Sequence, residues 1–162
     1  MSRISISTLS LLLIATINPA DAQSLEGRWR LLGAQEVRAN GEVVRLPWGA
    51  YPIGSLLVQG GACYVQIMST DVPSFAAGQS VRDQMKATLL SSYVGYSGAC
   101  AFSDQGGTLT IKVDAAWRPD MVGTEQKRVF RFENGLLIYG PAAAVRTGSE
   151  ILTRRLTFER IP

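Results

Sequence analysis

Apolar and polar residues alternate in short runs along most of the chain after residue 24. A period of two is typical of strands that bury one face. Glycine turns separate the runs, including the favoured hairpin pairs Asn40-Gly41 and Asn134-Gly135. The pattern predicts eight strands, over residues 25–37, 53–58, 62–69, 93–102, 108–117, 123–132, 136–139 and 151–160.

One segment departs from this alternation. Val81, Met85 and Leu89 are four residues apart, so they share one face of a helix. We therefore predict one short helix over residues 80–90, between the third and fourth strands. Eight antiparallel strands of this size avoid exposed edges by closing on themselves. The predicted fold class is all-β, an eight-stranded up-and-down antiparallel β-barrel with room for one small ligand.

Residues 1–22 have the order of a secretory signal peptide. Arg3 precedes an apolar run, Pro19 follows it, and Ala20-Asp21-Ala22 supplies the small-x-small cleavage site. We expect cleavage after Ala22, which leaves residues 23–162 as the barrel domain, exported to the periplasm or secreted. The alternative is a membrane anchor, but the apolar run is too short and too interrupted to span a bilayer. No membrane insertion is expected after cleavage.

Charge and composition narrow the function classes. The net charge is +3. The charges alternate with apolar residues and form no patch, so nucleic acid is not an expected partner. The chain has no histidine, which removes Ser-His and Cys-His nucleophile pairs and His-based metal sites. We predict neither a metal nor a cofactor.

Two cysteines, Cys63 and Cys100, are present. In an exported protein such a pair favours a disulfide. The alternative is two buried thiols that pack as small apolar side chains.

The strand over 123–132 separates into two faces. One face is charged and belongs in water: Glu125, Lys127, Val129, Arg131 and Glu133. The other carries both aromatic residues and is predicted to face inward: Thr124, Gln126, Arg128, Phe130 and Phe132.

Two further strands have equally clear faces. In the last strand the inward set is Leu152, Arg154, Leu156, Phe158 and Arg160. In the strand over 108–117 the inward set is Leu109, Ile111, Val113, Ala115 and Trp117.

Arg128 and Arg154 therefore point into the barrel. No carboxylate stands on the inward face of these strands, and an unpaired buried cation is costly. One interpretation is that the two arginines bind an anionic group such as a carboxylate, which a guanidinium grips through two hydrogen bonds. The alternatives are that they lie at the wet mouth of the barrel, or that a β-bulge reverses the faces.

The chain resembles the lipocalins. Gly27-Arg28-Trp29 opens the first strand and Arg160 ends the last one, as in lipocalins, where a basic residue packs across the tryptophan and closes the barrel floor through a cation–π contact. More specifically, the chain is similar to the bacterial and fungal lipocalin-like domain family. Segments that carry this similarity are 25–31, 65–68, 73–78, 93–98, 122–130 and 158–160.

The resemblance implies a barrel that binds a small hydrophobic molecule. We expect the polar end of the ligand at Arg128, Arg154 and Gln126, and the rest of it against four further residues, Tyr96, Phe130, Leu156 and Phe158. Gly27, Trp29 and Arg160 are expected to be structural.

The predicted function is an exported small-molecule-binding protein for a mainly hydrophobic ligand with an anionic or carbonyl head. No inward acid or base is evident, so the residues favour a binding protein over an enzyme. Two alternatives stay open: an isomerase- or cyclase-type enzyme that uses the same pocket, and a packed barrel that acts through its outer surface.

Overall fold

Ten strands and one helix make up the part of the chain that the computed structural model describes, residues 24–72 and 80–162. The predicted signal peptide and the segment 73–78 lie outside the described residues. The strands are β1 (Gly27–Val37), β2 (Val43–Arg45), β3 (Ile53–Gln59), β4 (Ala62–Met68), β5 (Tyr93–Ser103), β6 (Thr108–Ala116), β7 (Glu125–Glu133), β8 (Leu136–Pro141), β9 (Val145–Thr147) and β10 (Glu150–Ile161).

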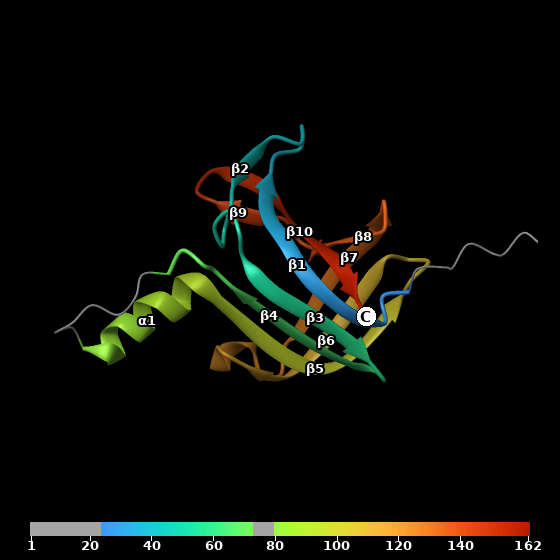
Figure 1. The fold of residues 1–162 in the computed structure, drawn as a ribbon, viewed down its shortest axis with the longest axis horizontal. Coiled ribbons are helices and arrows are strands. Elements are labelled where there is room, and N and C mark those ends of the chain that lie inside the picture. Colours follow the sequence, from blue (N-terminus) through green and yellow to red (C-terminus); the bar gives the residue numbers. More distant parts are fainter. Residues whose placement is uncertain (1–23, 73–79) are drawn as a thin grey trace, which may run out of the picture.

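Eight of these strands form a closed antiparallel barrel (Figure 1). Neighbours pair in the order β1, β3, β4, β5, β6, β7, β8 and β10, and β10 then pairs with β1. Closure leaves none of these eight strands with an unpaired edge along its whole length. The eight-stranded barrel predicted from the alternation is confirmed.

Two short strands stand where the sequence predicted only connecting segments. β2 pairs with the end of β1, and β9 pairs with the start of β10. They lie side by side at one end of the barrel (Figure 1), where Arg45 Nη1 donates to Thr147 Oγ1 at 3.4 Å. A strand of three residues is too short to show alternation, which is why the pattern missed both.

The helix α1 (Val81–Ser92) lies between β4 and β5 and projects to one side of the barrel (Figure 1). Its Met85 side chain is 44% exposed. A single 3-10 turn, η1 (Pro119–Met121), forms the corner between β6 and β7. Within the described residues, no helix is long and apolar enough to cross a membrane.

The hairpin between β7 and β8 shows how turn chemistry sets the register. Asn134 and Gly135 both have positive φ, 51° and 79°. This left-handed backbone matches the twist of the flanking strands and is tolerated best by Asn and Gly. The hairpin predicted at Asn134-Gly135 is confirmed.

Two bulges shift the inward face of their strands. In β1 the register with β10 changes between Leu31 and Gly33. In β6 the register with β5 changes at the pair Ser97–Ala115, because Asp114 is an extra residue. The prediction that Ala115 faces inward is therefore wrong: its side chain is exposed. An inserted residue reverses every following side chain of the strand.

Aromatic side chains and one arginine close the barrel floor. Trp29 is buried and stacks on Phe132 with their ring centroids 5.8 Å apart. The Arg160 guanidinium lies 4.4 Å from the centroid of the Trp29 ring, and its Nη1 donates to the Glu26 carbonyl at 2.9 Å. Gly27 has a φ of 132°, and a Cβ there would lie 2.5 Å from Arg160 Nη1. Because Gly27 has no side chain, the Arg160 guanidinium can lie against the face of the Trp29 ring.

A disulfide joins Cys63 in β4 to Cys100 in β5, near the floor. The Cα atoms are 5.8 Å apart, which is normal for a disulfide. The predicted disulfide is present, and the alternative of two free thiols is not.

We expect the double variant Cys63→Ala/Cys100→Ala to lose about 3–4 kcal/mol of unfolding free energy, because the bond closes a loop between residues that are 37 positions apart. Urea unfolding followed by tryptophan fluorescence measures the loss. As a control, a reductant should lower the stability of the parent protein and leave that of the variant unchanged. Equal unfolding midpoints for the two oxidised proteins would contradict the prediction.

Candidate functional site

The inward faces of β7 and β10 bring Arg128 and Arg154 to one small cavity. Burial alternates along both strands as predicted, with Phe130, Leu156 and Phe158 buried. The cavity has a volume of about 100 Å³. It lies in the half of the barrel away from the floor and is lined by Trp48, Val65, Ile67, Val94, Tyr96, Arg128, Tyr139, Pro141, Arg154 and Leu156.

Arg128 is held only by neutral groups. Its Nη2 donates to the Tyr96 hydroxyl at 3.0 Å and to Gln126 Oε1 at 3.1 Å, and its Nη1 donates to the Lys127 carbonyl at 3.0 Å. The guanidinium also lies 5.7 Å from the Tyr96 ring centroid. Among the described residues, no carboxylate is ion-paired with it. Arg128 is half-buried, and its positive charge has no counter-charge in the lining of the cavity.

The hydroxyl of Tyr139 is the second unusual polar group of the cavity. Tyr139 is 3% exposed, and its hydroxyl finds no hydrogen-bond partner of normal geometry in the described residues. Burial, followed by the neighbouring Tyr96 phenol, raises the pKa of Tyr139 well above its usual value. The hydroxyl thus stays protonated and can donate one hydrogen bond.

Arg154 has a partner that the sequence analysis missed. Its Nε and Nη2 donate to Glu36 Oε1 at 3.0 and 2.5 Å. Glu36 is fully buried, and its Oε2 lies 3.6 Å from Arg45 Nη1. The prediction that Arg154 lacks a carboxylate is therefore wrong, because Glu36 neutralises it across the β1–β10 pair.

The bulge in β1 explains why Glu36 was missed. Before the bulge, Trp29 and Leu31 face inward, so strict alternation puts Glu36 outside. The extra residue Leu32 reverses the faces, and Ala34 and Glu36 become buried. A glycine within a strand, here Gly33, is the one signal that could have suggested a bulge.

Trp48 covers the cavity from the segment between β2 and β3. Its side chain is 7% exposed and lines the cavity. The Arg154 guanidinium lies 5.1 Å from the centroid of its ring. Trp48 was also missed, since it follows a proline in a short turn where no alternation identifies an inward side chain.

The seven residues predicted to bind a ligand fall into three groups. Arg128, Arg154, Tyr96 and Leu156 line the cavity. Gln126 contacts it indirectly through Arg128.

Phe130 and Phe158 instead fill the core. Phe130 packs on Phe132 at 5.8 Å between ring centroids, and Phe158 packs on Tyr139 at 5.9 Å. Neither ring lines the small cavity, because aromatic side chains already fill the barrel toward its floor. The predicted contact of these two rings with a ligand stays a prediction.

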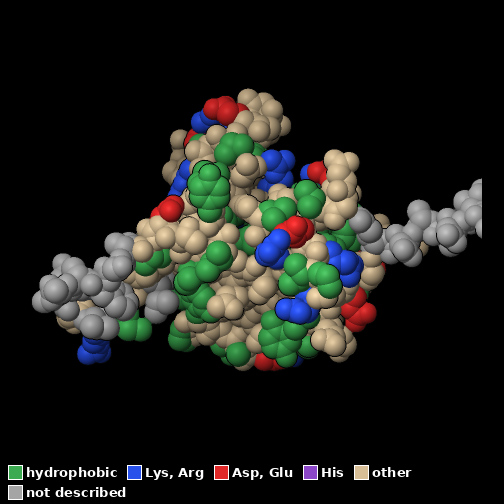
Figure 2. Space-filling model, in the orientation of Figure 1, with side chains coloured by type: hydrophobic (Ala, Val, Ile, Leu, Met, Phe, Trp, Pro, Cys, Tyr) green, Lys and Arg blue, Asp and Glu red, His purple; other side chains and the backbone are tan. Residues whose placement is uncertain are grey.

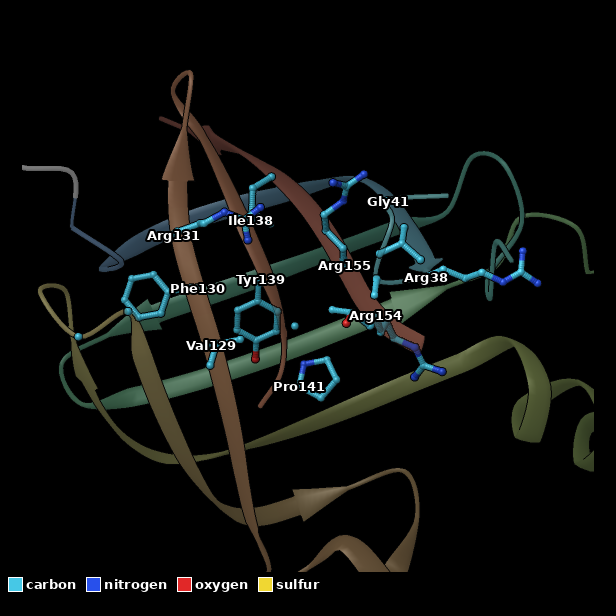
Figure 3. A pocket seen from close by; sticks show the side chains of 16 residues that line it. Arg38, Gly41, Val129, Phe130, Arg131, Ile138, Tyr139, Pro141, Arg154 and Arg155 are labelled. Carbon is cyan, nitrogen blue, oxygen red and sulfur yellow. The ribbon is translucent and has the colours of Figure 1, made fainter. Parts of the chain in front are cut away.

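A larger groove of about 500 Å³ is lined by residues of β7, β8 and β10 and by the segment that follows β1 (Figure 3). Figure 3 shows Arg38 and Arg154 at one end and Phe130 at the other. Its other arginines already have acceptors: Arg38 pairs with Glu42 and Glu150, Arg131 with Glu133, and Arg155 with Gln35. Because these arginines are already paired, the groove offers a ligand fewer free hydrogen-bond donors than the small cavity lined by Arg128 and Tyr139. We call that small cavity the inner cavity.

Charges of both signs are interspersed on the face of the molecule seen in Figure 2. No single-sign patch is visible on that face, as the alternating charges of the sequence suggested.

We expect Glu36→Gln to lower the unfolding free energy by about 2 kcal/mol or more, because it leaves Arg154 without its buried counter-charge. The matched control is Glu159→Gln, which removes the half-buried partner of the exposed Arg30 and should cost less than about 1 kcal/mol. Chemical denaturation of both variants measures the difference. Equal losses would mean that the Glu36–Arg154 pair behaves as a surface pair.

The family comparison agrees with this architecture. A family model described as a lipocalin-like domain matches residues 26–161. This span runs from the start of β1 to the end of β10 and includes every residue of the cavity. A search of curated proteins finds no match. The chain therefore belongs to the lipocalin-like domain family.

Proposed function

We propose that the protein binds a small molecule with an anionic or carbonyl head in the inner cavity. One observation carries the proposal: the same half-open cavity is lined by the half-buried Arg128 guanidinium, which has no counter-charge, and by the Tyr139 hydroxyl, which has no hydrogen bond of normal geometry. A half-buried cation without a counter-ion is costly, and so is a buried hydroxyl without a good hydrogen bond. A ligand oxygen supplies what both groups lack.

The chemistry of the lining suits such a ligand. Arg128 offers a charge-assisted donor, and Tyr139 offers a neutral donor. Val65, Ile67 and Leu156 give an apolar wall for the remaining atoms of the ligand. A carboxylate or carbonyl oxygen can accept hydrogen bonds from Arg128 and Tyr139, while the carbon atoms of the ligand pack against this wall.

A second candidate function is isomerase- or cyclase-type catalysis in the same cavity. It is favoured by the Tyr96 hydroxyl, which lies 3.0 Å from Arg128 Nη2. Together these groups could stabilise negative charge that develops on a substrate oxygen. The cavity lining of the described chain contains no Asp or Glu to act as a base, so binding is the function that the geometry supports best.

Export is the second part of the proposal. The signal-peptide pattern of residues 1–22 supports it, and so does the disulfide, because such bonds persist in oxidising compartments. A ligand-binding barrel of this kind would meet its ligand in the periplasm or outside the cell.

We expect Tyr139→Phe to weaken ligand binding about threefold to tenfold, because it removes one donor to the ligand. The same change should raise the unfolding free energy of the ligand-free protein by about 1 kcal/mol, because an unsatisfied buried hydroxyl disappears. Sodium propionate and the ketone butanone, titrated by NMR, serve as probes of the acidic and the carbonyl head. Opposite effects on binding and on stability distinguish a ligand-directed hydroxyl from a structural one.

Charge variants complete this test. Arg128→Gln should weaken propionate binding about tenfold or more, because it removes a charge-assisted contact. Lys127→Gln is the matched control, since Lys127 is exposed on the same strand and the change removes the same charge. Equal affinity of the Arg128→Gln and Lys127→Gln proteins, or no binding of any acid or ketone, would contradict the proposal.

For export, we expect the protein secreted or released from the periplasm to begin at Gln23, because the small-x-small motif ends at Ala22. Intact-mass spectrometry of the protein expressed from its full sequence measures this. An Ala20→Arg change should block processing and leave the precursor mass. An unprocessed parent protein in the cytoplasm would contradict the prediction.

A further inference from the structure

The charges around the inner cavity restrict the ligand further than its head group does. This inference rests on the function proposed above. Two guanidinium groups line the cavity, but Glu36 neutralises that of Arg154. Arg128 has only neutral partners. Arg45 also lies near Glu36, with its Nη1 3.6 Å from Oε2, but its side chain is half exposed to water and does not line the cavity. The lining therefore has one positive charge to compensate, and a second negative charge on the ligand would have no counter-ion there.

The size of the cavity sets a second limit. Its volume of about 100 Å³ is smaller than the roughly 150 Å³ of a protein cavity that holds benzene. Pockets for drug-sized ligands are about 300–1,000 Å³. A long acyl chain has no space below Arg128, because the core residues Leu109, Phe130 and Phe158 fill the barrel there.

A chain that pointed toward the mouth would meet Trp48. The indole lines the cavity, is almost fully buried and contacts the Arg154 guanidinium.

The turn that carries Trp48 is also held in place. Gly49 N donates to the Leu46 carbonyl at 3.0 Å, and Gly49 has a φ of 82°. Gly49 packs so closely on Asp71, just after β4, that a Cβ would collide with the carboxylate. The geometry of the turn and the burial of the indole therefore keep Trp48 against the cavity.

We propose that this cavity selects a short monocarboxylate, with Arg128 setting the charge and Trp48 setting the chain length. The ligand carboxylate accepts hydrogen bonds from Arg128 and from Tyr139. Its short alkyl group packs against Val65, Ile67 and Leu156, beneath the indole.

Four probes separate charge from length in NMR titrations of the whole mature protein. They are propionate, its neutral isostere butanone, the short dianion malonate and the long monoanion octanoate. Propionate should bind about tenfold more tightly than each of the other three, which corresponds to the loss of one charge-assisted contact or to steric exclusion.

Variants of Trp48 test the length limit. Trp48→Ala should raise octanoate affinity about tenfold and change propionate affinity less than about threefold. Trp48→Leu keeps more of the buried apolar volume and should give an intermediate gain, so a destabilised Trp48→Ala protein does not end the test. The matched control is Tyr51→Ala, which removes an aromatic side chain of the same segment that is 81% exposed. It should bind all four probes as the parent does.

The outcomes distinguish this inference from the function on which it rests. If octanoate binds the parent as tightly as propionate, or if both Trp48 variants leave octanoate affinity unchanged, the length limit is wrong. If butanone or malonate binds as tightly as propionate, the charge limit is wrong. In these cases binding at the inner cavity still stands, whereas no binding by any probe overturns both.

Discussion

The pairing of β1 with β10 is the constraint on which the rest of the structure depends. This pairing closes the sheet into a barrel. At each end of the pair, an arginine of β10 contacts a side chain of β1. Near the floor, Trp29 is the direct partner of Arg160, and near the mouth, Glu36 is the direct partner of Arg154. The first contact closes the floor, and the second leaves Arg128 as the uncompensated cation of the cavity.

The bulge at Leu32 is what makes both contacts possible in one pair of strands. Trp29 and Glu36 are an odd number of residues apart, so a regular strand would send them to opposite faces. The inserted residue brings both inside. The register of the β1–β10 pair therefore decides whether Arg154 has a counter-charge, because the inserted residue that breaks the alternation also turns the Glu36 carboxylate inward.

Much of the barrel could be predicted from the sequence, and there are physical reasons why the rest could not. Period-two alternation in β7 and β10 is local, so the inward positions of Arg128 and Arg154 could be predicted. Bulges arise from pairing with a distant strand, and for this reason Glu36 and Ala115 were assigned to the wrong face. The inward position of Trp48 depends on tertiary packing of a short turn, and such packing leaves no periodic signal.

The cavity is small because bulky aromatic side chains fill one half of the barrel interior and polar side chains occupy much of the other half. Toward the floor, Trp29, Phe132 and Phe158 pack as an ordinary core. Toward the mouth, Tyr96, Arg128 and Tyr139 replace apolar side chains and need partners. Their mutual contacts satisfy Arg128 in part and leave the Tyr139 hydroxyl unsatisfied, which is the feature that a folding requirement alone does not explain.

The disulfide also gives the molecule a stiff base and a softer rim. Cys63–Cys100 joins two strands beside the β3–β4 turn, at the end where Arg160 already clamps the indole. The opposite end is held by ion pairs, short strands and a turn, none of them covalent. Breathing motions should therefore concentrate at the rim, and a solute can exchange there while the base stays shut.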